Sequence, residues 1–237
     1  MLPYISEFIG TCLLIVLGCG VVANVNLKTS GMKGAGAIQI TLAWGLAVMI
    51  PAFIFGEASG ASFNPALTLA LAIDGSFPWN KVAGYIVAQL LGAFTGGCIV
   101  WLLFKDHLDQ EPDAGTKLGV FATGPSIRNF WLNFASEFVG TFILVFAIKG
   151  IMNVPGLAAG TDKLFVMGII VAIGMSLGGL TGYAINPARD LGPRLAHAVL
   201  PIKGKGDSRF DYGLIVPIFA PILGAIAAVL VFSIIPW

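Results

Sequence analysis

Two stretches of this sequence share a tripeptide: residues 59–66 read Ser-Gly-Ala-Ser-Phe-Asn-Pro-Ala, and residues 182–189 read Gly-Tyr-Ala-Ile-Asn-Pro-Ala-Arg. Proline suits the first residue of a helix, because the N–H that it lacks would have no partner there. Asparagine is a preferred N-cap residue, since its side-chain oxygen accepts a hydrogen bond from the first helical turn. Asn64 and Asn186 are therefore expected to cap two helices, each preceded by a loop of mostly small residues.

The chain around these motifs is strongly apolar. Of its 237 residues, 57% are hydrophobic and only 11% are charged, whereas a soluble domain carries about a quarter charged residues. Its 13 basic and 12 acidic side chains cannot cover a water-exposed surface, and the net charge of +1 excludes a nucleic-acid binder that uses a basic face. The 31 glycines suit closely packed membrane helices. The composition predicts an integral membrane protein.

Apolar run length divides the chain into spans, since about 20 helical residues cross the hydrocarbon core of a bilayer. Six runs are long enough: residues 5–25, 35–56, 82–104, 130–148, 164–182 and 212–237. Segments 59–73 and 181–200 are too short and too interrupted, so each is expected to be a loop that dips into the membrane and continues as a half-length helix. The expected fold is all-α, with six transmembrane helices and two re-entrant half-helices.

The chain also repeats itself. Residues 5–11, Ile-Ser-Glu-Phe-Ile-Gly-Thr, recur as residues 135–141, Ala-Ser-Glu-Phe-Val-Gly-Thr. We expect one membrane domain over the whole chain, built from repeats at about 1–104 and 130–237 that a polar loop, 105–129, joins. Three spans per half is an odd number, so the second half is inverted relative to the first. Irregular backbone at membrane depth is tolerated where it is buried or lines a water-filled path, and this predicts a pore.

These motifs resemble the two signature loops of the aquaporin family, and the resemblance covers essentially the whole chain. Two Asn-Pro-Ala motifs in an inverted repeat, with Arg189 after the second, are highly specific. The resemblance implies a passive channel for water and small neutral solutes in a plasma or bacterial inner membrane, assembled as a homotetramer, with no catalysis, cofactor or metal. The resemblance also identifies the residues of the two Asn-Pro-Ala motifs as site residues: Asn64, Pro65, Ala66, Asn186, Pro187 and Ala188.

The physics of the paired motifs supports ion exclusion. Two half-helix N-termini that face one another concentrate positive potential at the pore centre. Asn64 and Asn186 would each present N–H donors there and orient a passing oxygen atom. A cation, including a proton carried along a water chain, meets an unfavourable field, whereas a neutral hydroxylated solute does not.

By the same resemblance, four residues form the selectivity filter: Trp44, Gly174, Tyr183 and Arg189. The fixed fork of donors on arginine suits hydroxyl oxygens. Trp44 with Gly174 is typical of the glycerol-conducting branch, the aquaglyceroporins, because a water-only filter usually has histidine and a smaller ring. Tyr183 stands where a glycerol facilitator typically has phenylalanine, so we expect conduction of several small polyols and of water.

Two more residues mark the glycerol-conducting branch by resemblance, Asp190 and Arg194. From the residues alone, Asp190 is also an acidic residue in the first turn of a helix, where the helix dipole favours it. An i, i+4 pair with Arg194 would add a little stability. Ser62 departs from the branch, which commonly has histidine two residues before the first motif asparagine.

Glu7 and Glu137 are carboxylates inside otherwise apolar spans. The resemblance implies that they brace the re-entrant loops through backbone N–H groups, so that loop carbonyls point into the pore. Those carbonyls would belong to Gly60, Ala61, Ser62, Gly182, Tyr183 and Ala184.

Two other functions stay open, a water-selective channel and an ion-coupled secondary transporter. For the transporter, Glu7 and Glu137 are the only candidate coupling groups. A membrane enzyme lacks a nucleophile–base pair. The family arrangement places both termini in the cytoplasm, although it would leave three basic side chains inside and eight outside, against the positive-inside rule.

Overall fold

The computed structural model describes all 237 residues and contains helices joined by turns and loops. The helices are α1 (Leu2–Asn26), α2 (Ala37–Ser59), α3 (Pro65–Ile73), α4 (Trp79–Gln110), α5 (Ala114–Phe121), α6 (Phe130–Met152), α7 (Thr161–Thr181), α8 (Pro187–Val199), α9 (Phe210–Gly213) and α10 (Val216–Ile234). Six stretches are long and apolar enough to cross a membrane, namely α1, α2, α4, α6, α7 and the α9–α10 segment. The six predicted spans are confirmed.

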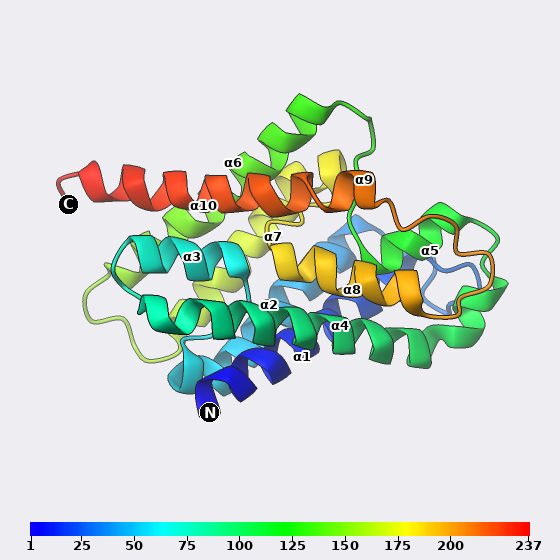
Figure 1. Ribbon diagram of the computed structural model, residues 1–237, viewed down its shortest axis with the longest axis horizontal. Coiled ribbons are helices and arrows are strands. Elements are labelled where there is room, and N and C mark those ends of the chain that lie inside the picture. The colour runs from blue at the N-terminus through cyan, green and yellow to red at the C-terminus, as the bar shows by residue number, and fades with distance from the viewer.

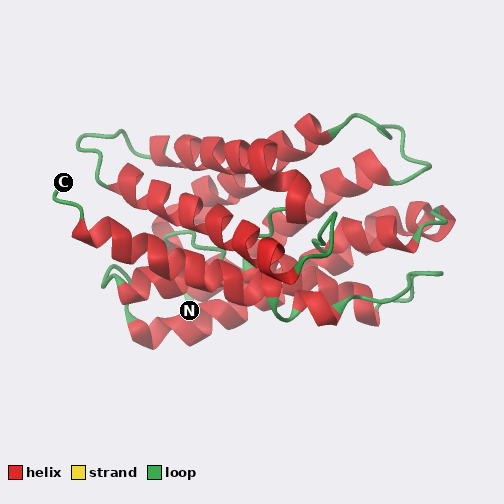
Figure 2. Ribbon diagram, turned by 90° about the horizontal axis from the view of Figure 1, so that it is seen from above, coloured by secondary structure: helices red, strands yellow, loops and turns green.

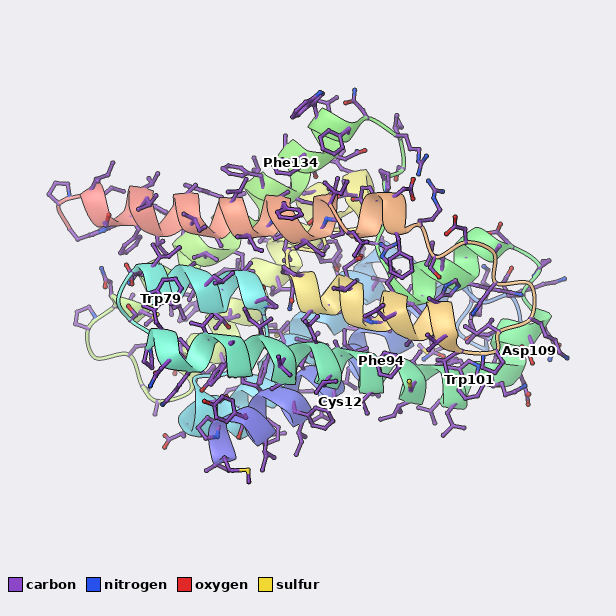
Figure 3. The ribbon with its side chains drawn as sticks, viewed as in Figure 1. Cys12, Trp79, Phe94, Trp101, Asp109 and Phe134 are labelled. Atoms are coloured by element: carbon purple, nitrogen blue, oxygen red, sulfur yellow. The ribbon has the colours of Figure 1, made fainter.

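The long helices run side by side along the long axis of the molecule (Figures 1 and 2). Trp79 and Asp109 lie at opposite ends of α4, so this helix extends over most of that axis (Figure 3). Both termini lie toward the same end, as an even number of spans requires (Figure 1).

The half-helices α3 and α8 begin at the predicted caps. The Asn64 Oδ1 accepts a hydrogen bond from the N–H of Ala66 at 3.0 Å, and the Asn186 Oδ1 accepts one from Ala188 at 3.0 Å. The two helices run outward in opposite directions from the middle of the molecule, between α4 and α10 (Figure 1). Their N-termini therefore face each other at the centre, as expected.

Close helix contacts depend on glycine at two matching places. A Cβ atom on Gly92 of α4 would lie 2.2 Å from the carbonyl oxygen of Phe8 on α1. A Cβ atom on Gly224 of α10 would lie 2.2 Å from the carbonyl oxygen of Phe138 on α6. Only glycine lets these backbones approach so closely, which is how membrane helices gain dispersion contacts.

The structure differs from the sequence expectation in two segments. Residues 105–129, expected to be a polar loop, contain the end of α4 and all of α5. Helical propensity does not require an apolar residue, and Lys105 and Asp109 form an i, i+4 ion pair at 2.7 Å there. The last span is interrupted between α9 and α10, where Pro217 lacks the N–H that a continuous helix would use.

Candidate functional site

A cavity of about 320 Å³ lies where the two re-entrant loops meet. It extends from Trp44 and Arg189 to the first turn of α7, where Asp162 and Lys163 line it. Eighteen of its 27 lining residues are hydrophobic, and they come mainly from the surrounding helices. Of the residues singled out by sequence, the lining includes Trp44, Gly60, Ala61, Ser62, Asn64, Tyr183, Ala184, Asn186 and Arg189.

The two motif asparagines hold the loops to each other. The Asn64 Nδ2 donates to the carbonyl of Ile185 at 2.8 Å, and the Asn186 Nδ2 donates to the carbonyl of Phe63 at 2.8 Å. Each amide nitrogen carries two protons, so one proton per asparagine stays free for a solute. Helix capping and solute contact are compatible at these residues.

Both loops contain backbone in the left-handed region at equivalent positions. The residues three and one before each motif asparagine have φ values of 52° (Ala61), 47° (Phe63), 38° (Tyr183) and 43° (Ile185). Side-chain-bearing residues rarely adopt this region, so the conformation persists only where neighbouring groups enforce it.

Glu7 stabilises the left-handed backbone of the first loop. This fully buried carboxylate accepts hydrogen bonds from the backbone N–H of Ser62 at 3.1 Å and of Phe63 at 2.8 Å. The hydroxyl of Ser59 donates a third at 2.7 Å.

Glu137 has the matching contacts in the second loop and is also fully buried. It accepts from the N–H groups of Ala184 and Ile185, both at 2.9 Å, and from the hydroxyl of Thr181 at 2.7 Å. No protein group donates a hydrogen bond to the backbone carbonyls of five loop residues that line the cavity, so these carbonyls remain available as acceptors: Gly60, Ala61, Ser62, Tyr183 and Ala184.

Two supporting residues escaped the sequence reasoning. The Gln89 Nε2, fully buried on α4, donates to the Glu7 carboxylate at 2.7 Å and to the Thr68 hydroxyl at 3.0 Å. The Tyr85 hydroxyl donates to the carbonyl of Ser59 at 2.9 Å. A polar amide inside an apolar span is the signal that marks Gln89, and a search for charges alone overlooks it.

Arg189 is 8% exposed, and its guanidinium carbon lies 3.9 Å from the centroid of the Trp44 ring. This is a cation–π distance. The guanidinium donates no hydrogen bond to the protein, so its donors are available to whatever occupies the cavity.

The ring of Tyr183 lies against the glycine face of α7. A Cβ atom on Gly174 would lie 2.8 Å from Tyr183 Cζ, and one on Gly178 would lie 2.8 Å from its Cδ1. Gly174 does not line the cavity itself, because the tyrosine ring occupies the room that it leaves. The Tyr183 hydroxyl is buried and has no hydrogen-bond partner.

Asp190 and Arg194 lie behind the cavity. They form a fully buried ion pair, with Arg194 Nε 2.8 Å from Asp190 Oδ1. Gly182 also lies outside the lining and contacts Thr123 instead. Neither the ion pair nor Gly182 reaches a solute directly.

The comparisons with known proteins agree with this geometry. Residues 2–232 match the family model described as Major intrinsic protein. The chain belongs to the major intrinsic protein family. A probable glycerol uptake facilitator protein from Thermotoga maritima is 51% identical over 95% of this chain and 96% of that relative. A D/L-lactic acid transporter from Lactiplantibacillus plantarum is 40% identical over 94% of this chain and 93% of that relative.

A solved structure has the same fold. The aquaglyceroporin from Plasmodium falciparum superposes with a TM-score of 0.85 at 30% identity, over 98% of this chain and 95% of that one. The predicted all-α membrane fold is therefore confirmed, and the protein is a multi-pass membrane protein. The matched relatives are channels and transporters.

Proposed function

We propose that this protein is a passive channel for glycerol, other small uncharged solutes and water. One observation carries the proposal: a buried arginine, Arg189, stacks on Trp44 beside a cavity and leaves its guanidinium donors without a protein acceptor. A buried donor set without partners is costly unless a polar solute or water satisfies it. The names of the relatives, a glycerol uptake facilitator and an aquaglyceroporin, agree.

In this mechanism a polyol presents two different faces to the pore. Its alkyl side contacts the rings of Trp44 and Tyr183, while its hydroxyls exchange between Arg189, the loop carbonyls and the free amide protons of Asn64 and Asn186. Each site binds weakly and the next lies nearby, so the solute passes in single file without being trapped. We propose that no reaction is catalysed and no cofactor is required.

Ion exclusion follows from the charges along the path. The N-termini of α3 and α8 point at the centre, and Arg189 adds a full positive charge at one end. The carboxylates of Glu7 and Glu137 are engaged by loop donors and lie outside the cavity lining, so they offer no direct site to a passing cation. The carboxylate that does line the cavity, Asp162, is paired with Lys163. A coupling site of the kind that an ion-driven transporter needs is therefore not part of the proposal.

The two halves, 1–104 and 130–237, are proposed to be inverted repeats within one channel domain. Two pairs of equivalent residues support this. Glu7 and Glu137 each hold the re-entrant loop of their own half. Gly92 and Gly224 each lie against the backbone of the first helix of their own half. The homotetramer implied by the resemblance is likewise a proposal, to be tested by chemical cross-linking in native membrane.

The test is stopped-flow light scattering of reconstituted vesicles under a water gradient and then under a glycerol gradient. We expect fast responses to both, with a low activation energy and no saturation. Fast water flux with glycerol excluded would mean a water-selective channel. Saturable, gradient-driven uptake would mean a transporter. A third gradient, of undissociated lactic acid, tests the solute class named for the Lactiplantibacillus plantarum relative.

A further inference from the structure

No protein acceptor holds the Arg189 guanidinium, so apart from its stacking on Trp44 its position depends on the backbone that carries it. On one side, the backbone N–H of Arg189 donates to the Asn186 Oδ1 at 3.2 Å. On the other side, the next residue is Asp190, which is fully buried and bound to Arg194. The filter arginine is therefore fixed between two anchored neighbours.

The Asp190–Arg194 pair in turn binds every polar group of Thr123. The Asp190 Oδ2 accepts from the Thr123 N–H at 2.7 Å and from its hydroxyl at 2.6 Å. The Arg194 Nη2 donates to the Thr123 carbonyl at 2.7 Å. Arg194 also donates to the carbonyl of Ser208 at 2.7 Å, so one buried pair joins two segments outside the pore to α8.

Thr123 contacts the second re-entrant loop at its other face. A Cβ atom on Gly182 would lie 3.1 Å from the Cβ of Thr123 and 3.3 Å from its Cγ2. Gly182 has φ +84° and directly precedes Tyr183 in the chain. Thr123 thus supports the loop just before Tyr183 while it is bonded to the residue just after Arg189.

We propose that Thr123, held by the Asp190–Arg194 pair, is a positioning residue that sets the spacing between Tyr183 and Arg189 and thereby favours glycerol over water. The inference rests on the proposed function. Glycerol spans the filter and contacts both side chains at once, so its passage depends on their separation. Water contacts one side chain at a time and is far less sensitive to it.

The test uses Thr123→Val, which removes the hydroxyl donor and keeps the shape and the backbone bonds. Thr123→Ser retains the hydroxyl and serves as the rescue variant. The matched control is Thr116→Val. Thr116 donates its N–H at 2.6 Å and its hydroxyl at 2.8 Å to a single oxygen of Asp113, but that pair is exposed and forms the N-terminal cap of α5.

Glycerol and water permeability are measured per channel in vesicles with quantified protein. We expect Thr123→Val to lower the glycerol-to-water ratio by roughly threefold to tenfold, the range for one ordinary hydrogen bond, because only part of the larger effect of a charge-assisted bond reaches the filter. Water permeability should change by less than about twofold, and Thr123→Ser and Thr116→Val should keep the wild-type ratio. Arg194→Lys keeps the charge but cannot make the same set of bonds, so it should lower the ratio in the same direction.

Three results overturn the proposal: an unchanged ratio in Thr123→Val, an equal change in Thr116→Val, or a proportional fall of both permeabilities that Thr123→Ser does not reverse. If Thr123→Val does not fold, an unchanged glycerol-to-water permeability ratio in Arg194→Lys overturns the proposal instead. Failure of the channel function itself is seen separately, as a wild-type protein that passes no glycerol.

Discussion

At the scale of single residues, the pore contains polar groups that the protein leaves partly or wholly unpaired. The motif asparagines are bonded on one side and free on the other, whereas the Arg189 guanidinium and the Tyr183 hydroxyl have no protein partner. The unpaired donors of Arg189 reduce stability and lower the desolvation cost of a hydroxylated solute that pairs with them, whereas the Tyr183 hydroxyl is buried away from the solute. Solute binding in the pore therefore depends on the donors that have no acceptor within the protein.

Tyr183→Phe tests the unpaired hydroxyl. Because this hydroxyl has no partner, removing it should leave stability unchanged or raise it by about 1 kcal/mol. The hydroxyl is buried against Gly174 of α7, so its removal lets the ring move closer to α7 and widens the filter, and the glycerol-to-water ratio should rise. Stopped-flow permeabilities and the midpoint of thermal unfolding check both points. Unchanged flux for every solute would contradict the role of the hydroxyl.

Gly174→Val tests the room beneath the tyrosine ring. Its Cβ would lie 2.7 Å from Thr41 Cγ2 and 2.8 Å from Tyr183 Cζ, so both side chains must shift, and the tyrosine ring moves away from α7 toward the cavity. We expect glycerol permeability to fall by roughly tenfold, with a smaller fall for water, because a narrower filter excludes the larger solute first. Gly168→Val on the same helix is the control, since its Cβ would meet no atom within 4 Å. Equal effects of the two substitutions would be inconsistent with this mechanism.

At the scale of elements, the two re-entrant loops are shaped by carboxylates from neighbouring helices. Each loop contains two non-glycine residues in the left-handed region, and each is held by one buried glutamate. A neutral amide of the same size cannot replace the glutamate, because the surrounding N–H and O–H groups all donate to the carboxylate and an amide accepts at only one of its two ends.

Glu137→Gln places an amide NH₂ group against the N–H donors of the second loop. We expect a loss of about 3 kcal/mol or more in stability, since at least one charge-assisted hydrogen bond is lost and a donor is left buried. Glycerol and water flux should both fall. Thermal unfolding in detergent and vesicle permeability measure these effects. Glu57→Gln, an exposed glutamate on α2, is the control and should behave as wild type.

At the scale of the whole molecule, charge and fold give opposite indications of orientation. The positive-inside rule favours termini outside the cell, whereas the family arrangement places them in the cytoplasm. The segment between α8 and α9 lies at the opposite end of the molecule from both termini (Figure 1). Labelling of one residue at each end therefore determines the topology.

Lys203→Cys should react with a membrane-impermeant maleimide on intact cells, because this side chain is 79% exposed at the end opposite the termini. Asn80→Cys, exposed at the start of α4, should react only after the cells are opened. The native cysteines, Cys12, Cys19 and Cys98, lie within α1 and α4 and provide the background. The reverse labelling pattern would place the termini outside.

The sequence by itself determined the six spans, the capped half-helices and the pairing of the two motifs. Span length and helix capping depend on residues within a few positions of each other, and such local properties are visible in a linear pattern. The roles of Gln89, Tyr85 and Thr123, and the absence of a protein partner for Arg189, were decided only by the tertiary structure. Asn186 and Phe63 are 123 residues apart in the chain, yet the Asn186 Nδ2 lies 2.8 Å from the Phe63 carbonyl oxygen. Contacts of this kind depend on how the helices pack, because packing alone sets which distant side chains meet.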